Sequence, residues 1–415
     1  MNSYGEIATA ARLALDSIRA HKLRSFLTLL GIIIGVASVI LVGAAIDGLG
    51  VYAEGVTAKA FGTDSFLVAQ IASVGRLTRK ELAEKQRRNK TIRPEDVAYL
   101  NVATGDTHLY SPYQQRFDDV RSRNRVYEGA AIIGCSHTLP EIREIPILDG
   151  RFFTDAEERM RRPVAVIGED IRAALFEDVN PIGRRIHVSG QEFTVIGLLE
   201  KQGSSFGRSL DTPVYLPVTL YYQFYGSRRG GTVFGRARTE TGLGMEDALD
   251  ITRAALRVRF KTQPGAPDSF DTLTPDSVRS FVDQILGVIA AVVVPVTSIS
   301  LVVGGIVIMN IMLVSVTERT REIGIRKSLG ARQGDILLQF LTESVILSMA
   351  GGLVGLALGA AAAMILSAVF GTTLKVTLPY VLLAIFVSST VGIVSGWYPA
   401  RRAARMDPVA ALRAE

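Results

Sequence analysis

Residues 284–317 read QILGVIAAVVVPVTSISLVVGGIVIMNIMLVSVT, a run of 34 residues without Asp, Glu, Lys or Arg. A helix needs about 20 apolar residues to cross the hydrocarbon core of a bilayer, so this run is long enough to do so. Three further charge-free runs share this property, at 25–46, 344–374 and 376–400. The 415-residue chain is therefore predicted to be an α-helical membrane protein with four transmembrane helices, and an ordinary soluble enzyme is excluded.

The composition agrees with a membrane protein. Hydrophobic residues make up 48% of the chain and charged residues 21%, and the mean hydropathy is +0.27. The single cysteine, Cys135, cannot form a disulfide within the chain, which excludes a small secreted fold built on disulfides.

Positive charge is concentrated around the membrane segments. Residues 47–283 contain 32 basic and 32 acidic residues, so the net charge of +6 comes from the rest of the chain. Lys and Arg collect in short loops on the cytoplasmic side of a membrane. Since both ends and the loop after residue 317 are basic, we expect both termini in the cytoplasm and residues 47–283 outside it. A neutral external segment argues against a nucleic-acid partner.

The predicted domain organisation has eight parts. Residues 1–24 place Ile7, Ala11 and Leu15 on one face, which predicts an amphipathic helix on the inner leaflet, with a solvated cytoplasmic helix as the alternative. A 34-residue helix would measure about 50 Å against a hydrocarbon core of about 30 Å, so the second span is expected to carry a stalk extension or to include residues outside the membrane. The parts are a cytoplasmic amphipathic helix at 1–24, transmembrane helix 1 at 25–46, an extracytoplasmic domain at 47–283, transmembrane helix 2 with its stalk at 284–317, a cytoplasmic loop or helix at 318–335, transmembrane helix 3 at 344–370, transmembrane helix 4 at 376–400 and a cytoplasmic tail at 401–415.

The external segment is predicted to be a large mixed α/β domain. Apolar and alternating runs predict a strand at 164–168, a hairpin between 185–188 and 192–196, and helices at 169–176 and 246–259. A run at 213–218 contains prolines, which favour an edge strand. The tract 76–93 is densely charged with both signs, and we expect a solvated helix or loop there, with a partner-docking surface as the alternative.

Small residues recur at every fourth position in three of the membrane segments. This spacing places them on one stripe of a helix and lets neighbouring helices approach closely. The stripes predict helix packing, either within one bundle or between two copies of the chain. Their glycines are Gly31, Gly35, Gly351, Gly355, Gly359, Gly392 and Gly396.

The nucleotide-binding motif G-x-x-x-x-G-K-[ST] and the metalloprotease motif H-E-x-x-H are absent from the sequence. No two of the four histidines are spaced like a metal-binding pair. No charged residue lies within a membrane run, which disfavours an ion-coupled transporter. The adjacent acids Glu157 and Glu158 are expected to be solvated. We therefore assign no catalytic residue, cofactor or metal to the chain.

The cytoplasmic stretch 318–331 reads ERTREIGIRKSLGA and mixes charged with apolar residues. Ile323, Ile325 and Leu329 interrupt the charges. A signal for membrane topology needs only Lys and Arg, so it leaves these residues and the two glutamates unexplained. Apolar side chains among charges are typical of a helix that docks on another protein.

Residues 318–331 resemble the cytoplasmic loop of MacB-type and FtsX-like ABC transporter permeases. Four further stretches are similar to this family: 21–35 (HKLRSFLTLLGIIIG) to its first membrane segment, 398–413 (YPARRAARMDPVAALR) to its C-terminal stretch, and 150–158 and 180–190 to its external domain. The resemblance covers both ends and the centre of the chain, and it is weak over about 70–145 and 220–275.

The resemblance implies a permease subunit of a bacterial inner membrane. Family members pair with an ABC ATPase, usually as two permeases with two ATPases, so we expect a separate ATPase that binds ATP and Mg, and a second permease copy as a homodimer or paralogous heterodimer. Some members also use a periplasmic adaptor protein. The family mechanism is mechanotransmission, in which ATPase closure moves the membrane helices and changes the external domain. The ATPase-coupling residues would be Glu318, Arg319, Arg321, Glu322, Ile323, Gly324, Ile325, Arg326, Lys327, Leu329, Gly330 and Ala331.

Two other functions remain as alternatives. The chain could be a membrane-anchored receptor or scaffold that docks a cytoplasmic signalling protein without an ATPase. A membrane-anchored hydrolase is disfavoured because no catalytic constellation is present. Within the ABC reading, the size of the external domain favours efflux or lipoprotein release over the function of short FtsX-like members, and the sequence leaves the substrate open.

Overall fold

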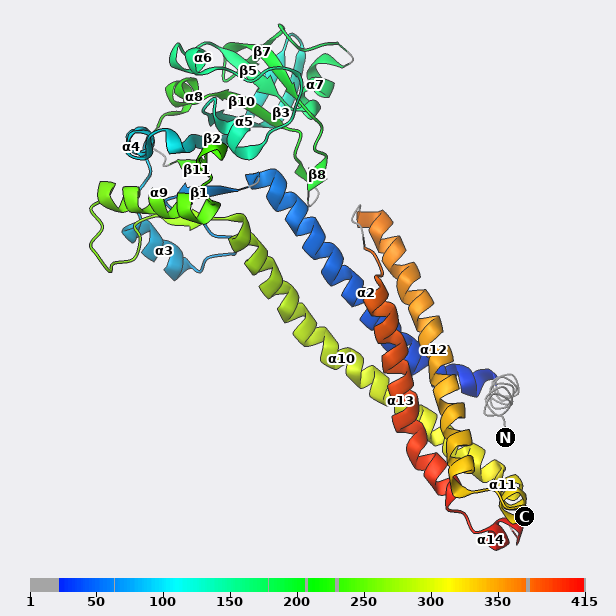
Figure 1. The fold of residues 1–415 in the computed structure, drawn as a ribbon. Coiled ribbons are helices and arrows are strands. Elements are labelled where there is room, and N and C mark those ends of the chain that lie inside the picture. The colour runs from blue at the N-terminus through cyan, green and yellow to red at the C-terminus, as the bar shows by residue number, and fades with distance from the viewer. Residues whose placement is uncertain are drawn as a thin grey trace. The chain divides into compact units, whose positions relative to one another are not determined.

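The computed structural model describes residues 22–62, 64–177, 179–205, 208–227, 231–370 and 374–413. The chain divides into two compact units, one of Met1–Tyr52 with Asp283–Glu415 and one of Ala53–Val282. The first unit is a bundle of long helices and the second is a mixed α/β domain (Figure 1). Most of the amphipathic helix predicted at 1–24 lies outside the described residues.

Four helices of the described chain are long and apolar enough to cross a membrane. They are α2 (Lys22–Phe61), α10 (Pro275–Glu318), α12 (Gln333–Phe370) and α13 (Leu378–Ala404). Two of them extend well past the charge-free runs. Helix α2 continues for 15 residues after Ile46, and α10 begins nine residues before Gln284. At 1.5 Å per residue these two helices measure about 60 and 66 Å, twice the hydrocarbon thickness.

All seven glycines of the predicted stripes lie against a neighbouring helix of the same chain. A Cβ on Gly31 in α2 would lie 2.7 Å from the Cα of Gly304 in α10, and a Cβ on Gly355 in α12 would lie 2.8 Å from the carbonyl oxygen of Ile33 in α2. Real Cβ atoms do not approach backbone this closely, so these contacts require glycine. The other stripe glycines meet side chains or backbone of α2, α10 and α12 in the same way, at Gly35, Gly351, Gly359, Gly392 and Gly396.

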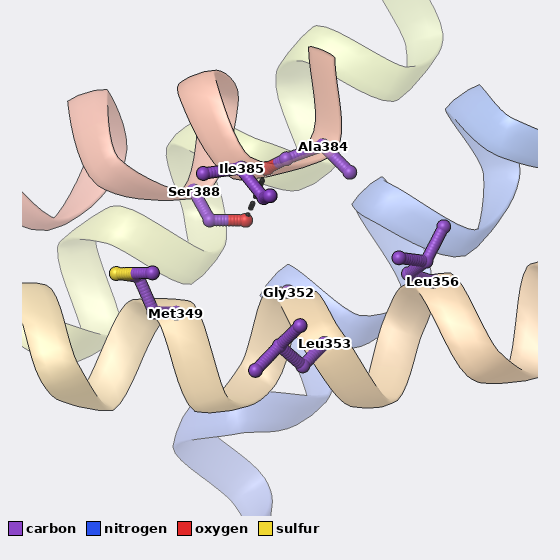
Figure 2. Close-up of a pocket in the computed structure, with 7 residues that line it drawn as sticks. All are labelled: Met349, Gly352, Leu353, Leu356, Ala384, Ile385 and Ser388. Atoms are coloured by element: carbon purple, nitrogen blue, oxygen red, sulfur yellow. Dashed lines mark hydrogen bonds between the residues drawn. The ribbon is translucent and has the colours of Figure 1, made fainter. Parts of the chain in front are cut away.

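Helices α12 and α13 pack through small residues. Gly352 faces the hydroxyl of Ser388, and Gly392 and Gly396 face the hydroxyls of Ser348 and Ser344. Each of these serines donates its hydroxyl proton to a carbonyl of its own helix, so no polar atom is left unpaired at the contact. The gap beside Ser388 has a volume of about 10 Å³, room for one water molecule at most. Figure 2 shows the residues that line it.

The second unit is built on a ten-stranded sheet in the order β12-β1-β11-β2-β3-β10-β5-β7-β4, with β6 paired to β2 and β7. Most neighbours are antiparallel, whereas β10 with β3 and β5 with β7 are parallel. The strands are β1 (Ser65–Ala69), β2 (His108–Ser122), β3 (Arg125–Cys135), β4 (Ile147–Gly150), β5 (Val164–Ile167), β6 (Arg185–Val188), β7 (Gln191–Leu199), β10 (Pro213–Pro217), β11 (Thr232–Ala237) and β12 (Asp271–Leu273). A separate pair is formed by β8 (Ser204–Ser205) and β9 (Arg208–Ser209).

Seven α-helices of the described chain accompany this sheet, and five of them contribute side chains to three buried apolar clusters. The helices are α3 (Arg79–Arg88), α4 (Pro94–Thr104), α5 (Leu139–Arg143), α6 (Asp155–Arg159), α7 (Glu169–Phe176), α8 (Val218–Tyr225) and α9 (Met245–Arg259). Single 3₁₀ turns occur at Gly105–Thr107 and Thr239–Thr241. The predicted strand at 164–168, the hairpin of β6 and β7, and the two predicted helices are confirmed.

One strand prediction was wrong. The run at 213–218 was expected at a sheet edge because of its prolines, yet β10 lies inside the sheet between β3 and β5. Pro213 and Pro217 are its first and last residues, so their missing N–H groups remove no ladder bond from its middle. The charged tract 76–93 contains α3, which begins with a Thr78–Glu81 capping box and has no buried residue, as expected of a solvated helix.

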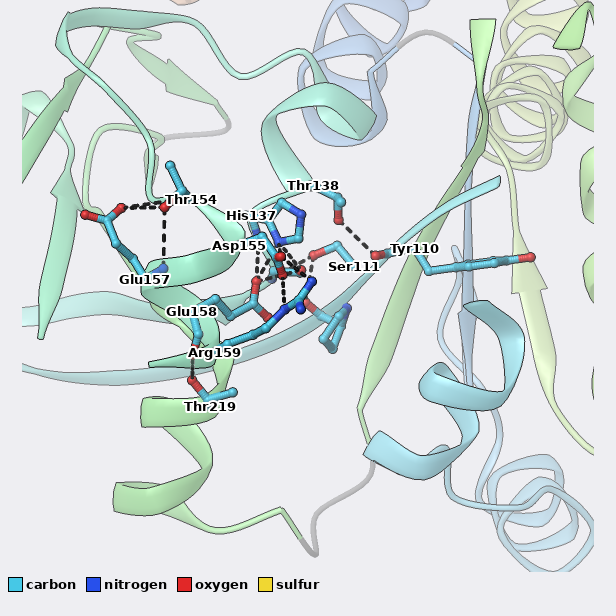
Figure 3. Close-up of polar contacts among 12 residues, drawn as sticks. Tyr110, Ser111, His137, Thr138, Thr154, Asp155, Glu157, Glu158, Arg159 and Thr219 are labelled. Atoms are coloured by element: carbon cyan, nitrogen blue, oxygen red, sulfur yellow. Dashed lines mark hydrogen bonds and ion pairs between the residues drawn. The ribbon is translucent and has the colours of Figure 1, made fainter. Parts of the chain in front are cut away.

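The predicted solvation of Glu157 and Glu158 was also wrong. Glu157 completes a capping box with Thr154 at the start of α6 and accepts two hydrogen bonds of 2.7 Å from Arg151. These Arg151 bonds, with further bonds from Thr154, lower the pKa of Glu157 to about 2. Glu158 accepts bonds from His137 and Ser136 (Figure 3). Both carboxylates therefore hold α6 in place rather than facing solvent.

We predict that Gly355→Ala destabilises the bundle by about 1–3 kcal/mol, because its new Cβ meets the Ile33 carbonyl, which belongs to backbone and cannot move aside. The matched control is Gly287→Ala in α10, where a Cβ meets nothing within 4 Å. The thermal midpoint of the purified chain should fall for the first variant and stay or rise for the second. Equal midpoints would show that α2 and α12 are not packed this closely.

We predict that the stabilisation from Glu157 is lost in acid. Its folded pKa of about 2 lies below the usual 4.5, so the contribution is complete above about pH 4.5 and disappears as the pH falls toward 2. In the full chain, Glu157→Gln should speed hydrogen–deuterium exchange of residues 151–160 at pH 7 and match wild type near pH 2. Glu128→Gln, on the exposed part of β3, is the control, and a Glu157→Gln effect that persists unchanged at pH 2 would contradict the prediction.

Candidate functional site

The stretch 318–331, predicted to be cytoplasmic and to dock a partner, forms a separate short helix, α11 (Thr320–Ser328). Helix α10 ends at Glu318, and Arg319 has a non-helical backbone that changes the direction of the chain. At the other end, Gly330 has a φ of +96°, a left-handed conformation that glycine adopts without strain. The Asp335 carboxylate then accepts the N–H of Arg332 just before α12. Local sequence thus sets both ends of α11.

One face of α11 is anchored in the bundle. Ile323 is only 3% exposed and packs with Val316, Ile336 and Phe340 in a buried cluster that also includes Ala403. Gly324, next to it, is buried as well. Helix α11 also contacts α14 (Pro408–Arg413), whose Ala411 is buried. The inner face therefore fixes the orientation of α11 relative to the membrane helices.

The prediction that Ile323 presents an apolar knob to a partner was wrong, because this side chain is buried in its own chain. Ile325 and Leu329 point away from the bundle and are 45% and 84% exposed. Around them lie further exposed residues of the predicted coupling set, Glu318, Arg321, Glu322, Arg326 and Gly330. We call the exposed set, Glu318, Arg321, Glu322, Ile325, Arg326 and Leu329, the outer face of α11.

Three of the predicted coupling cations are bonded within the chain. Lys327 donates a hydrogen bond of 2.6 Å from Nζ to the carbonyl oxygen of Met406. Arg319 forms an ion pair of 3.4 Å with Glu343 in α12, whose carboxylate is only 3% exposed. Arg326, in contrast, bonds the exposed amide of Gln339 at 2.7 Å. Arg319 and Lys327 thus fix α11 in position, and Arg326 belongs to the outer face.

Sequence reasoning missed Glu343 as a partner for this helix. Its position held a signal, since Glu343 immediately precedes the charge-free run at 344–374, while Arg319 follows the run at 284–317 at its cytoplasmic end. Two opposite charges at the same predicted membrane boundary are candidates for an ion pair between adjacent helices.

A basic groove lies at the end of α13, close to α11. It has a volume of about 640 Å³ and is lined by Tyr398, Arg401, Arg402, Arg405 and Met406 at the end of α13. Met406 is the residue whose carbonyl binds Lys327. Arginines in the last turn of a helix also suit its negative dipole end. The groove therefore offers three guanidinium groups to an acidic partner close to α11.

A compact polar cluster of the external domain is centred on Glu158 (Figure 3). Its Oε2 accepts bonds from the hydroxyl of Ser136, the backbone N–H of His137 and the His137 ring, at 2.9, 2.9 and 2.8 Å. The bond to Glu158 raises the pKa of His137. Because the Ser136 hydroxyl donates to a carboxylate, it is not activated by the histidine for attack. The cluster ties the turn after β3 to α6 and is not arranged as a catalytic triad.

The residues that the structure describes contain no candidate metal site. Among them, no group of three or more His, Cys, Asp or Glu side chains is placed to hold a metal ion. Cys135 is fully buried, and burial raises the pKa of its thiol well above the ordinary value, so it is a poor nucleophile.

Comparisons with known proteins match both units. The family model of the MacB-like periplasmic core domain matches residues 25–255, and that of the FtsX-like permease C-terminal region matches 284–408, which includes α11. The chain is 32% identical over 416 residues to the "Uncharacterized ABC transporter permease YknZ" of Bacillus subtilis (strain 168), covering 97% of this chain and 98% of that protein.

Longer relatives carry an ATP-binding part in their names. The chain is 37% identical over 427 residues to the "Macrolide export ATP-binding/permease protein MacB" of Azoarcus sp. (strain BH72), and it spans only 60% of the length of that protein. Among solved structures, the periplasmic region of MacB from Actinobacillus actinomycetemcomitans aligns with a TM-score of 0.44 and 15% identity, over 55% of this chain and 95% of that one.

The first family match alone covers more than half of the chain, and the second covers the bundle with α10 to α13. Together with the full-length similarity to YknZ, these matches give a consistent assignment. The chain belongs to the ABC transporter permeases that combine a MacB-like periplasmic core domain with an FtsX-like C-terminal region.

Proposed function

We propose that this chain is a permease subunit that an ABC ATPase drives from the cytoplasm, and that the ATPase docks on the outer face of α11. The observation that carries the proposal is the two-sided character of this helix. Its inner face is fixed in the bundle through Ile323, whereas Ile325 and Leu329 are exposed among charges on the other side. A helix with this arrangement can receive a force from a partner and transmit it to the helices that hold it.

The charge pattern supports the orientation that docking requires. With Lys and Arg on the cytoplasmic side, α11, the basic groove and both termini face the cytoplasm, where ATP is available. The external domain then lies on the opposite side of an inner, cytoplasmic membrane. Its balance of 32 basic and 32 acidic residues offers no electrostatic attraction for nucleic acid.

The proposed mechanism is mechanotransmission through α2 and α10. Each is one continuous helix from the membrane bundle into the residues of the external domain, and α10 ends directly before Arg319 and α11. A helix transmits displacement along its axis because each turn is bonded to the next. ATP shifts the external domain only if ATPase closure favours one permease state over the other, and a shift from 1:99 to 99:1 takes about 5.5 kcal/mol.

We propose that the subunit composition and the class of substrate are those of the family. Two copies of the chain, or this chain and a paralogue, would act with two ATPases that bind ATP and Mg, and a periplasmic adaptor would join them in a Gram-negative envelope. The printed names of several relatives state macrolide export, which favours efflux, with handling of a lipoprotein or other periplasmic substrate as the second option.

We predict that Leu329→Asp weakens ATPase binding about tenfold or more, since an apolar anchor at the centre of an interface is replaced by a charge. Leu329 is 84% exposed, so the variant should insert and remain as stable as wild type. Val102→Asp in α4 of the external domain is the control, because Val102 is equally exposed, at 83%. Affinity purification from native membranes should recover an ABC ATPase with wild type and the control but not with Leu329→Asp.

Equal recovery of the ATPase with Leu329→Asp would contradict docking on the outer face of α11. Recovery of a signalling protein without ATP-binding activity, lost in the same variant, would instead support the receptor or scaffold function. Charge reversal at Arg321, an exposed cation of the outer face, gives a second probe, whereas reversal at Arg326 or Lys327 would also break the bond to Gln339 or to Met406.

We predict that inserting two glycines after Gly287 in α10 uncouples the external domain while the ATPase still binds. Nothing lies within 4 Å of a Cβ at this position, so the insertion disturbs the helix without a clash. In wild type, ATP with vanadate should change hydrogen–deuterium exchange of residues 53–282, and the insertion should abolish this change. The same insertion at Gly265, in a surface turn with a φ of +80°, is the control. A nucleotide-dependent change that survives insertion in α10 would exclude this helix as the lever.

A further inference from the structure

The external domain contains a cavity of about 600 Å³ beside the last turns of α2. This volume lies within the range of about 300–1,000 Å³ that is usual for small-molecule sites. Its apolar floor is formed by Ile133, Leu199 and Tyr215, which belong to the buried core of the domain. Tyr113, Arg143 and Lys59 line the cavity above this floor. Neither the family matches nor the proposed coupling surface assigns a role to it.

Arg143 is the least satisfied polar side chain at this cavity. Its Nη2 donates to the carbonyl oxygen of Lys59 at 3.2 Å, and its guanidinium lies over the rings of Tyr113 and Phe234, at 5.7 and 5.2 Å. Its Nε atom is fully buried and has no hydrogen-bond partner. No carboxylate of the described chain forms an ion pair with it. A buried donor without an acceptor costs stability, so Arg143 is not fully satisfied within the chain.

Two of the three acids that line the cavity, Asp211 and Glu144, are bonded within the chain, whereas the third, Glu200, is exposed and adjoins Lys201. The Asp211 carboxylate accepts the backbone N–H groups of Gln202 and Gly203, at 2.6 and 2.9 Å. Glu144 forms an ion pair of 3.0 Å with Arg236. Lys59 Nζ, like Arg143, bonds a carbonyl oxygen, that of Gln202 at 2.9 Å. Lys59 and Arg143 are thus bonded to neutral groups of the chain, Arg143 also to the hydroxyls of Tyr113 and Tyr215, and the two cations can bind one anionic group together.

Tyr215 adds a neutral donor to the floor. Burial raises the pKa of Tyr215, and the nearby charge of Arg143 opposes this rise without cancelling it. The phenol therefore stays protonated at neutral pH. The floor thus combines apolar surface with a hydroxyl group beside Arg143, which suits a ligand with a charged head and an apolar body.

We propose that this cavity binds an anionic amphiphile, with its carboxylate or phosphate group held by Arg143 and Lys59 and its apolar chain against Ile133, Leu199 and Tyr215. Such a ligand would touch α2 directly, because Arg143 and Lys59 are already joined through the Lys59 carbonyl.

Photoaffinity labelling of the full chain in phosphatidylcholine nanodiscs tests the proposal. The probes are diazirine derivatives of dodecanoic acid, dodecyl phosphate and, as the neutral control, dodecanol. Peptides that contain Ile133 or Tyr215 should be labelled about tenfold more by at least one anionic probe than by dodecanol, since bonds to a charged group add that much affinity. Labelling by one anionic probe alone identifies a carboxylate or a phosphate as the preferred head group.

Variants at one position assign the selectivity to Arg143. Arg143→Met should reduce anionic labelling about tenfold, Arg143→Lys should retain part of it, and Arg162→Met, an exposed arginine of the same domain, should leave it unchanged. Equal labelling by dodecanol, or anionic labelling that Arg143→Met leaves intact, overturns the proposal. If Arg143→Met proves unstable, the preference of wild type for anionic over neutral probes decides alone. The assay requires no ATPase, so its failure would leave the proposed docking surface standing.

Discussion

A bilayer interior offers no hydrogen-bond partner to the protein backbone, and the membrane unit of this chain is organised around that constraint. Continuous helices satisfy their own N–H and C=O groups. Between helices of similar hydrophobicity, close contact replaces the hydrophobic effect as the source of attraction, and glycine permits such contact. Gly31 against Gly304 and Gly355 against Ile33 place backbone directly on backbone. The serines between α12 and α13 also leave no hydroxyl unpaired, because each donates its proton to a carbonyl of its own helix. The result is a bundle that can carry force but offers no sizeable cavity beside Ser388.

Features that depend on this constraint were predictable from the sequence. Every charge in hydrocarbon is costly whatever its neighbours, so charge-free runs located the four membrane helices without knowledge of their packing. Glycines at every fourth residue identified the contact stripes, because this spacing places them on one face of a helix. The sequence left open whether the stripes serve packing within one bundle or between two copies. The contacts of Gly31, Gly355 and Gly392 within one chain favour the single bundle. In the external domain, short apolar runs with clear ends, such as β5 and α7, were also found.

Other features required tertiary information. The extent of α2 beyond Ile46 was missed because a helix that leaves the hydrocarbon is no longer marked by apolar composition. Ile323 and Ile325 look alike in the sequence, and only the position of Phe340 in α12 decides that the first is buried and the second exposed. The cavity at Arg143 has no sequence signal, since its floor and walls come from α2, β3, α5, β7 and β10, which lie far apart along the chain. Local patterns therefore predicted a short helix at this place in the chain but not which of its two faces is buried.

The long helix α2 connects these observations in energetic terms. Its first turns lie in the bundle against α10 and α12, and its last turns line the Arg143 cavity. A ligand in that cavity acts on the permease only if it binds one position of α2 better than another, and a ligand indifferent to α2 would shift nothing however tightly it bound. Arg143 is bonded directly to the Lys59 carbonyl of α2, so an anion that attracts the guanidinium competes with that bond. Binding of such a ligand should therefore depend on the position of α2. By the reciprocity of linkage, a force applied to α2 from the membrane side would change the affinity of the cavity by the same factor.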